Sequence, residues 1–132
     1  MKAVLDSNVF VSALALPGGR AEKALMAAAD GRFALAISKP IIHEVVGVLA
    51  KKFGHDAEEL SRVAVFLSEL GEVVRPRRTV RILRDEPDNR ILECALAASA
   101  DAIVTGDRAM LELGEYKGVR IMTLRHFLKE IE

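Results

Sequence analysis

Short apolar runs that alternate with longer helical stretches are the feature that most limits how this chain can fold. The apolar runs are rich in Val, Ile, Leu and Ala and are bounded by Gly, Pro, Asp or Ser, which predicts strands. The predicted strands are residues 2–5, 33–37, 72–75, 102–105 and 120–122. Strands separated by helical segments form parallel βαβ units, with helices on both faces of one sheet. The pattern therefore predicts an α/β fold.

The helical stretches carry recognisable start and stop signals. Ser38, Lys39 and Pro40 predict a helix start with a capping hydroxyl and an early proline, and Asp56 predicts a second cap. Glycines follow several stretches and predict their ends. The predicted helices are residues 19–30, 38–54, 57–70, 88–100, 108–113 and 124–131.

Size and composition indicate one soluble globular domain over residues 1–132. The chain is 51% hydrophobic and 29% charged, an ordinary globular balance. The single Cys94 cannot form an internal disulfide, so we expect a reducing, cytoplasmic setting. The first apolar run is too short for a signal peptide, and no run approaches the roughly 20 residues of a membrane span. The net charge of +0 argues weakly against a nucleic-acid binder, although it conceals how the charges are distributed.

Two acids follow predicted strands at the points where those strands end. Asp6 comes directly after residues 2–5, and Asp107 follows Val104 by one short turn. In an open parallel sheet, ligands bind outside the carboxyl ends of the strands. We therefore expect both carboxylates at the same edge of the sheet.

Two further acids lie on predicted helices and share the apolar face of each helix. Glu44 lies three residues after Ile41, and Asp88 lies four residues before Leu92. An acid on such a face is costly to bury unless something pairs with it. Four carboxylates at one edge would raise each other's pKa values, and a divalent cation would remove that penalty. Because no His or Cys accompanies them, the oxygen ligands favour Mg²⁺ or Mn²⁺, which suits phosphodiester hydrolysis.

Each acid also has a purely structural explanation. Asp107 and Asp88 could cap their own helices, and Asp85 is another possible cap. Asp6 could be an ordinary turn residue, and Glu44 a solvated helix position. The joint pattern favours a site.

Four motifs in order make this chain resemble the PIN-domain family, including the VapC-type toxins of toxin–antitoxin systems. The motifs are Val4 to Val9, Ser38 to Leu49, Asp85 to Ala97, and Asp101 to Asp107. The resemblance implies a three-layer α/β/α sandwich with a central, mostly parallel sheet of about five strands. It also implies an endoribonuclease that uses Mg²⁺ or Mn²⁺ to activate water. Toxin-type members pair with an antitoxin and commonly self-associate, so an antitoxin partner and a homodimer are expected.

Carried onto this sequence, the resemblance makes four acids both metal-binding and catalytic: Asp6, Glu44, Asp88 and Asp107. Asn8 and Thr105 match supporting polar positions that would orient the metal ligands by hydrogen bonds. The stretch from Asp85 to Asp88 offers two acids, of which we assign Asp88. Glu93 would either assist or be an exposed helix residue.

A run of basic residues precedes the third motif and could contact RNA phosphates. The alternative is a solvated face paired with nearby acids. The run contains Arg75, Arg77, Arg78, Arg81 and Arg84. Arg20 and Lys23 are weaker candidates. We assign no catalytic role to the three histidines and expect Cys94 to be a small buried hydrophobe.

Other phosphate-handling classes fail on residue identity. A haloacid-dehalogenase-like site needs a second Asp two residues after the first, where this chain has Asn8. A receiver-like domain needs an Asp after the third strand, where Arg75 and Pro76 stand. A non-catalytic PIN-like module that binds RNA or protein, and a DNA-cleaving relative, stay open as alternatives.

Overall fold

Six strands form one sheet in the computed structural model, which describes all 132 residues. The sheet has the order β3-β2-β1-β4-β6-β5, and every neighbouring pair is parallel except the β5–β6 hairpin. The strands are β1 (Lys2–Leu5), β2 (Ala34–Ile37), β3 (Glu72–Val73), β4 (Ala102–Val104), β5 (Glu115–Tyr116) and β6 (Val119–Met122). The predicted three-layer, mostly parallel fold is confirmed. The additional strand, β5, has two residues and is too short to produce an apolar pattern.

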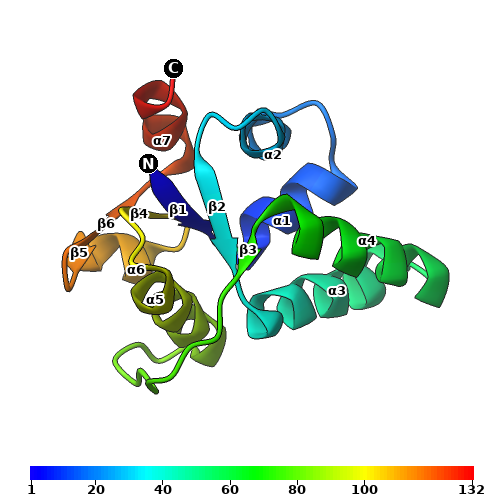
Figure 1. Cartoon of the computed structure of the whole chain (residues 1–132). Coiled ribbons are helices and arrows are strands. Elements are labelled where there is room, and N and C mark those ends of the chain that lie inside the picture. Colours follow the sequence, from blue (N-terminus) through cyan, green and yellow to red (C-terminus); the bar gives the residue numbers. More distant parts are fainter.

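Seven helices cover the two faces of the sheet. Figure 1 shows α1 to α4 on one side of the sheet and α5 and α6 on the other, and α7 packs against α2. The helices are α1 (Ser7–Ala15), α2 (Arg20–Ala29), α3 (Lys39–Phe53), α4 (Ala57–Leu70), α5 (Glu86–Ala98), α6 (Arg108–Leu113) and α7 (Leu124–Glu130). None of them has the length and apolar character that crossing a membrane requires.

Helix α1 was not predicted from the sequence. Its nine residues contain two serines and two valines, which are mediocre helix formers. The helix buries Val9, Phe10 and Ala13 in the core. Packing against α2 and α3 therefore outweighs local propensity.

Two other predicted boundaries move for identifiable reasons. The third strand ends at Val73 rather than at residue 75. One further backbone hydrogen bond follows the strand, from the Val74 N–H to the Ile37 carbonyl at 2.8 Å. Pro76 has no N–H with which to continue the ladder. Helix α5 begins at Glu86 rather than at Asp88, because Pro87 fits the first turn of a helix.

The two predicted caps have different outcomes. Asp56 and Glu59 form a reciprocal capping box at the start of α4, as expected of Asp56. Ser38 occupies the cap position of α3, but its hydroxyl makes no capping bond. That hydroxyl is buried beside the Cys94 thiol, and burial raises the pKa of Cys94 to about 12. Cys94 is thus the small buried residue that was predicted.

Backbone bonds join the ends of three strands at the edge where the acids lie. Asp6 N–H donates to the Val104 carbonyl at 2.9 Å, and Thr105 N–H donates to the Met122 carbonyl at 3.0 Å. The first residues past β1 and β4 are therefore held in register at the carboxyl edge of the sheet.

Candidate active site

A hydrogen-bonded chain of side chains links the ends of β1 and β4. The Thr105 hydroxyl donates to Asp6 Oδ2 at 2.6 Å and accepts from the Asp107 backbone N–H at 3.0 Å. Asp6 and Thr105 are both buried, whereas Asp107 is half-buried. Thr105 thereby fixes the position of one carboxylate and the turn that carries another.

Asp6 and Asp107 also cap helices, as the structural explanation of Asp107 anticipated. Asp6 Oδ1 accepts from the Asn8 backbone N–H at 3.4 Å at the start of α1. Asp107 Oδ2 accepts from the Met110 N–H at 2.9 Å at the start of α6. Each carboxylate has two oxygens with several lone pairs, so capping does not preclude binding a cation.

Asp88 joins these two acids from the first turns of α5. It is buried, with 6% of its surface exposed, whereas Asp85 is exposed and makes no side-chain capping bond. Of the two candidate acids in this stretch, Asp88 is the one that the structure brings towards Asp6 and Asp107.

The electrostatics of this cluster favour protonation when no cation is present. Burial raises the pKa of Asp88 to about 7, with further contributions from Asp107, Asp85 and Asp6. Burial also raises the pKa of Asp6, assisted by Asp107 and opposed by the hydrogen bonds from Thr105 and Asn8. Mutual repulsion and desolvation are the conditions that a bound cation would relieve.

Glu44 lies next to this cluster rather than within it. Its half-buried side chain, on α3, lines a cavity of about 170 Å³ together with Ser7 and Pro87, the chain neighbours of Asp6 and Asp88. Arg90 lines the same cavity, and its buried Nε–H has no partner. The structure therefore brings three of the four predicted acids together and places the fourth beside them.

Asn8 is exposed at the start of α1, and its side chain makes no hydrogen bond. Only its backbone N–H contacts the acids, through Asp6. The side chain instead lines a cavity outside the cluster, together with Thr105 and Gly106.

The donor set fits a hard divalent cation in type and charge. All four predicted ligands are carboxylates, and oxygen ligands suit Mg²⁺ or Mn²⁺. No three His, Cys, Asp or Glu side chains are yet close enough to form a complete metal centre. A cation bound by these carboxylates would offset their mutual repulsion.

The predicted basic run forms a loop that is fastened to α5. Asn89 Oδ1 accepts from Leu83 N–H at 3.0 Å, and Glu93 accepts from Val80 N–H at 2.8 Å and pairs with Arg90 at 3.0 Å. Glu93 is therefore a buried loop anchor and not an exposed helix residue. This role of Asn89 and Glu93 was not predicted from the sequence, although their separation of four residues places both on one side of α5.

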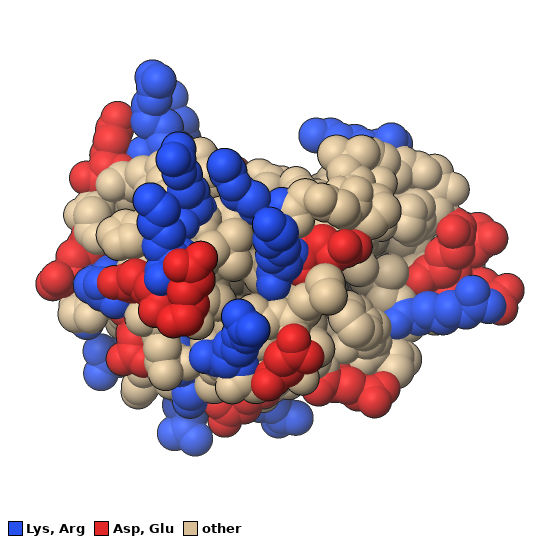
Figure 2. All heavy atoms as spheres, turned by 90° about the horizontal axis from the view of Figure 1, so that it is seen from above, with Lys and Arg blue, Asp and Glu red and all other residues tan.

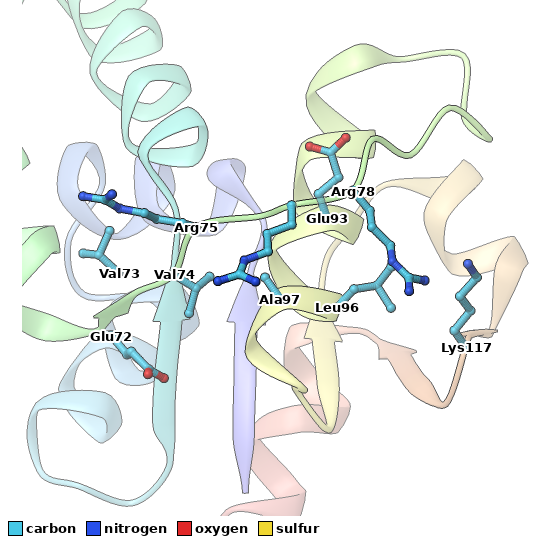
Figure 3. Close-up of a pocket in the computed structure, with 10 residues that line it drawn as sticks. Glu72, Val73, Val74, Arg75, Arg78, Glu93, Leu96, Ala97 and Lys117 are labelled. Carbon is cyan, nitrogen blue, oxygen red and sulfur yellow. The ribbon is translucent and has the colours of Figure 1, made fainter.

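Three arginines of this loop line a cavity of about 660 Å³ on the outer side of α5. In Figure 3 the loop crosses above α5, and Arg78 and Lys117 point into the same space beside Leu96. None of the five arginines forms an ion pair, so the alternative of a face paired with nearby acids is not observed. The lining arginines are Arg75, Arg77 and Arg78.

The fold and this cluster define an α/β protein with an acidic site past the carboxyl ends of β1 and β4. The chain matches the PIN domain family over residues 2–109 and belongs to that family, whose members are generally nucleases.

Known proteins resemble this chain over most of its length. An uncharacterized protein of Methanocaldococcus jannaschii is 24% identical over 144 aligned residues, which cover 100% of this chain and 92% of the relative. VapBC2 from Rickettsia felis, solved bound to a DNA fragment from their promoter, has a chain with a TM-score of 0.66 and 16% identity, covering 93% of this chain and 98% of that one. A chain of VapBC-1 from nontypeable Haemophilus influenzae matches with a TM-score of 0.65 and 16% sequence identity. The match covers 95% of this chain and 99% of that one. These two structures show the same fold.

Proposed function

We propose that this protein is a metal-dependent endoribonuclease that hydrolyses RNA phosphodiester bonds with Mg²⁺ or Mn²⁺. The observation that carries the proposal is the convergence of Asp6, Asp88 and Asp107 at one sheet edge, where burial and repulsion raise the pKa values of Asp6 and Asp88. Membership of the PIN-domain family supports a nuclease.

The four acids would hold the cation and are the proposed catalytic residues. Asp6 is oriented by the Thr105 hydroxyl, Asp107 by its own turn, and Asp88 by its position in the first turn of α5. Glu44 would complete the set from α3 by turning out of its cavity towards the other three. Asn8 and Thr105 are the proposed supporting residues.

A bound divalent cation would lower the pKa of a water molecule and stabilise charge on the phosphoryl and leaving oxygens. The chain's own contribution is to fix the oxygen ligands before substrate arrives. Thr105 prevents Asp6 from rotating, because its hydroxyl is already held by the Asp107 N–H. Fixed carboxylates need little reorganisation during the reaction.

We propose that the five arginines of the loop before α5 contact RNA phosphates away from the cleavage site. All five are exposed and none is neutralised by an acid. The anchors Asn89 and Glu93 hold the loop backbone on the helix that also carries Asp88. The five residues are Arg75, Arg77, Arg78, Arg81 and Arg84.

The first experiment is cleavage of labelled single-stranded RNA and DNA with Mg²⁺, with Mn²⁺ and with chelator, by the unmodified protein and by Asp6→Asn. We expect RNA cutting that requires metal and is lost in Asp6→Asn. Cutting of DNA alone would identify a DNA-cleaving relative. A folded protein that cuts nothing and binds no Mn²⁺ in calorimetry would overturn the proposal in favour of a binding module.

The separate position of Glu44 calls for its own variant. We expect Glu44→Gln to weaken Mn²⁺ binding and cleavage, with Glu69→Gln as a control on an exposed position of α4. Unchanged metal affinity in Glu44→Gln would limit the ligands to the three aspartates.

The structural neighbours support an antitoxin partner for the proposed enzyme. Because the two structural neighbours are VapBC proteins, we propose that this chain is the toxin of a toxin–antitoxin pair, acting as a homodimer in the cytoplasm. Light scattering after size exclusion tests the dimer, and a monomer at high micromolar concentration would reject it. Co-expression with the product of an adjacent reading frame tests the antitoxin, which should suppress RNA cutting.

A further inference from the structure

Two cavities outside the acidic cluster share the same two arginines. One has a volume of about 600 Å³ and extends from Asn8 and Thr105 to Arg20 and Arg125. The other, of about 410 Å³, continues from Arg20 and Arg125 between α2 and α7. We call the two together the α1–α7 groove. It begins at the acidic site and leads away from it.

The first part of the groove follows one side of α1. Asn8, Ser12 and Leu16 are spaced four residues apart, so they line it as a stripe about 12 Å long. The opposite wall is made by Thr105 and by Thr123, which follow β4 and β6 at the same sheet edge. Hydroxyl and amide groups of this kind contact the sugar and phosphate groups of nucleic acids.

The second part of the groove is basic. Five basic side chains line it against two acidic ones, Asp30 and Glu132. None of the five forms an ion pair. The five are Arg20, Lys23, Arg32, Arg125 and Lys129.

Figure 2 looks onto the end of the molecule that carries α2 and α7. Lys and Arg side chains project from its left half and middle, interspersed with acidic side chains, whereas the right end is mainly acidic. The net charge of +0 therefore conceals a cationic region connected to the acidic site.

We propose that the α1–α7 groove is the path of a single RNA strand, and that Arg20 and Arg125 hold a backbone phosphate beside the cleavage site. This inference rests on the proposed nuclease function and adds to it the direction in which the substrate leaves the acids. Asn8 and Ser12 of α1 contact the sugar–phosphate backbone near the acids. Lys23, Arg32 and Lys129 hold the next phosphates by charge.

The groove lies closer to the acids than the arginine-lined cavity of Figure 3 does. Leu96 and Ala97, which form the floor of that cavity, lie eight and nine residues along α5 from Asp88, or roughly 12–14 Å. The α1–α7 groove, by contrast, is lined by Thr105 itself, which touches Asp6. A strand cut at the acids therefore enters this groove directly.

The test measures RNA binding separately from cleavage. In an Asp6→Asn background, anisotropy of a labelled single-stranded RNA is compared between Arg20→Ala/Arg125→Ala and the matched control Lys51→Ala/Lys52→Ala. The control removes the same charge from exposed, unpaired lysines at the end of α3. We expect the groove variant to bind about tenfold more weakly. The slope of log K against log salt concentration should become shallower by about 0.7, the value for one phosphate contact on a single strand.

In an otherwise unmodified chain, the same double variant should raise KM with little change in kcat. Equal affinity and equal salt slope in the groove variant and the control would overturn the inference, while metal-dependent cutting would leave the nuclease intact. Groove-dependent binding without any cutting would overturn the nuclease and leave the groove as an RNA site. Weaker binding of a poly-glutamate peptide with unchanged RNA binding would assign the cations to an acidic protein segment instead.

Discussion

Thr105 performs two tasks with one hydroxyl group. The hydroxyl donates a hydrogen bond to Asp6 and accepts one from the Asp107 N–H, so the orientation of each partner depends on the other. A serine provides the same donor and acceptor, whereas a valine of the same shape provides neither. Thr105 is thus the residue at which a small change most directly tests whether the acids must be held in place.

We expect Thr105→Val to lower RNA cleavage and Mn²⁺ affinity by roughly tenfold to a hundredfold, the usual cost of losing a hydrogen bond that orients a metal ligand. Thr105→Ser should keep most of both. Cleavage assays and Mn²⁺ calorimetry on the two variants provide the comparison. A folded Thr105→Val protein with full activity would show that Asp6 needs no such support.

Most of the site follows from sequence position, because an acid one step past a parallel strand has only one edge at which to lie. Asp6 and Asp107 are in that situation, and Asp88 lies at the start of a helix on the same edge. The sequence determined the position of Glu44 less closely. Its side chain lies on α3, and the packing of α3 against α5 decides where that side chain points. Of the groove cations, the sequence offered Arg20 and Lys23 as weaker candidates and did not indicate Arg125, because Arg20 and Arg125 come together only through the contact between α2 and α7.

At the scale of elements, one contact between α4 and β2 allows no side chain. Gly71 ends α4, and a Cβ at this position would lie 2.9 Å from the Leu35 backbone oxygen and 3.0 Å from Leu35 Cγ. Its φ of −125° is open to any residue, so the constraint is steric. Because Leu35 is buried in β2, neither its backbone oxygen nor its side chain has room to move.

We expect Gly71→Ala to lower the free energy of unfolding by about 1–3 kcal/mol through overpacking. Gly47→Ala is the matched control, since Gly47 lies within α3 and a methyl group there would have no neighbour within 4 Å. It should raise stability by about 0.4–1 kcal/mol, because alanine favours helix and restricts the unfolded chain. Urea midpoints of the two variants should move in opposite directions, and a shift of the same sign would contradict the contact.

Local sequence rules were least reliable for the elements that packing creates. Residues 7–15 are poor helix formers, yet α1 forms because Phe10 and its neighbours enter the core. Strand β5 exists only as one half of a tight hairpin, with Lys117 at a φ of 47° and Gly118 at 87°. Neither feature has a periodicity that a single sequence reveals.

At the scale of the whole molecule, the acidic site lowers the stability of the fold when no cation is bound. The pKa of Asp88 is about 7 in the folded chain and 3.8 for a free side chain. The folded protein therefore binds the proton more tightly, and the associated stability is present at low pH and lost as pH rises from about 4 to about 7. Cation binding requires the deprotonated carboxylates, so its stabilising effect grows over the same range.

We therefore expect the Tm in chelator to fall between about pH 5 and about pH 8, and Mn²⁺ to raise the Tm more at the higher pH. Asp88→Asn should reduce that fall in Tm. In chelator at about pH 8, this variant should melt roughly 3–6 °C above the unmodified protein, which is the shift that about 1 kcal/mol produces in a domain of this size. The same variant should lose most of its response to Mn²⁺. Thermal unfolding over this pH range, with Glu69→Gln as a control on an exposed acid, measures all three effects. If Asp88→Asn and Glu69→Gln behaved alike in chelator, the burial and repulsion of the acids would be too weak to support the proposed cation.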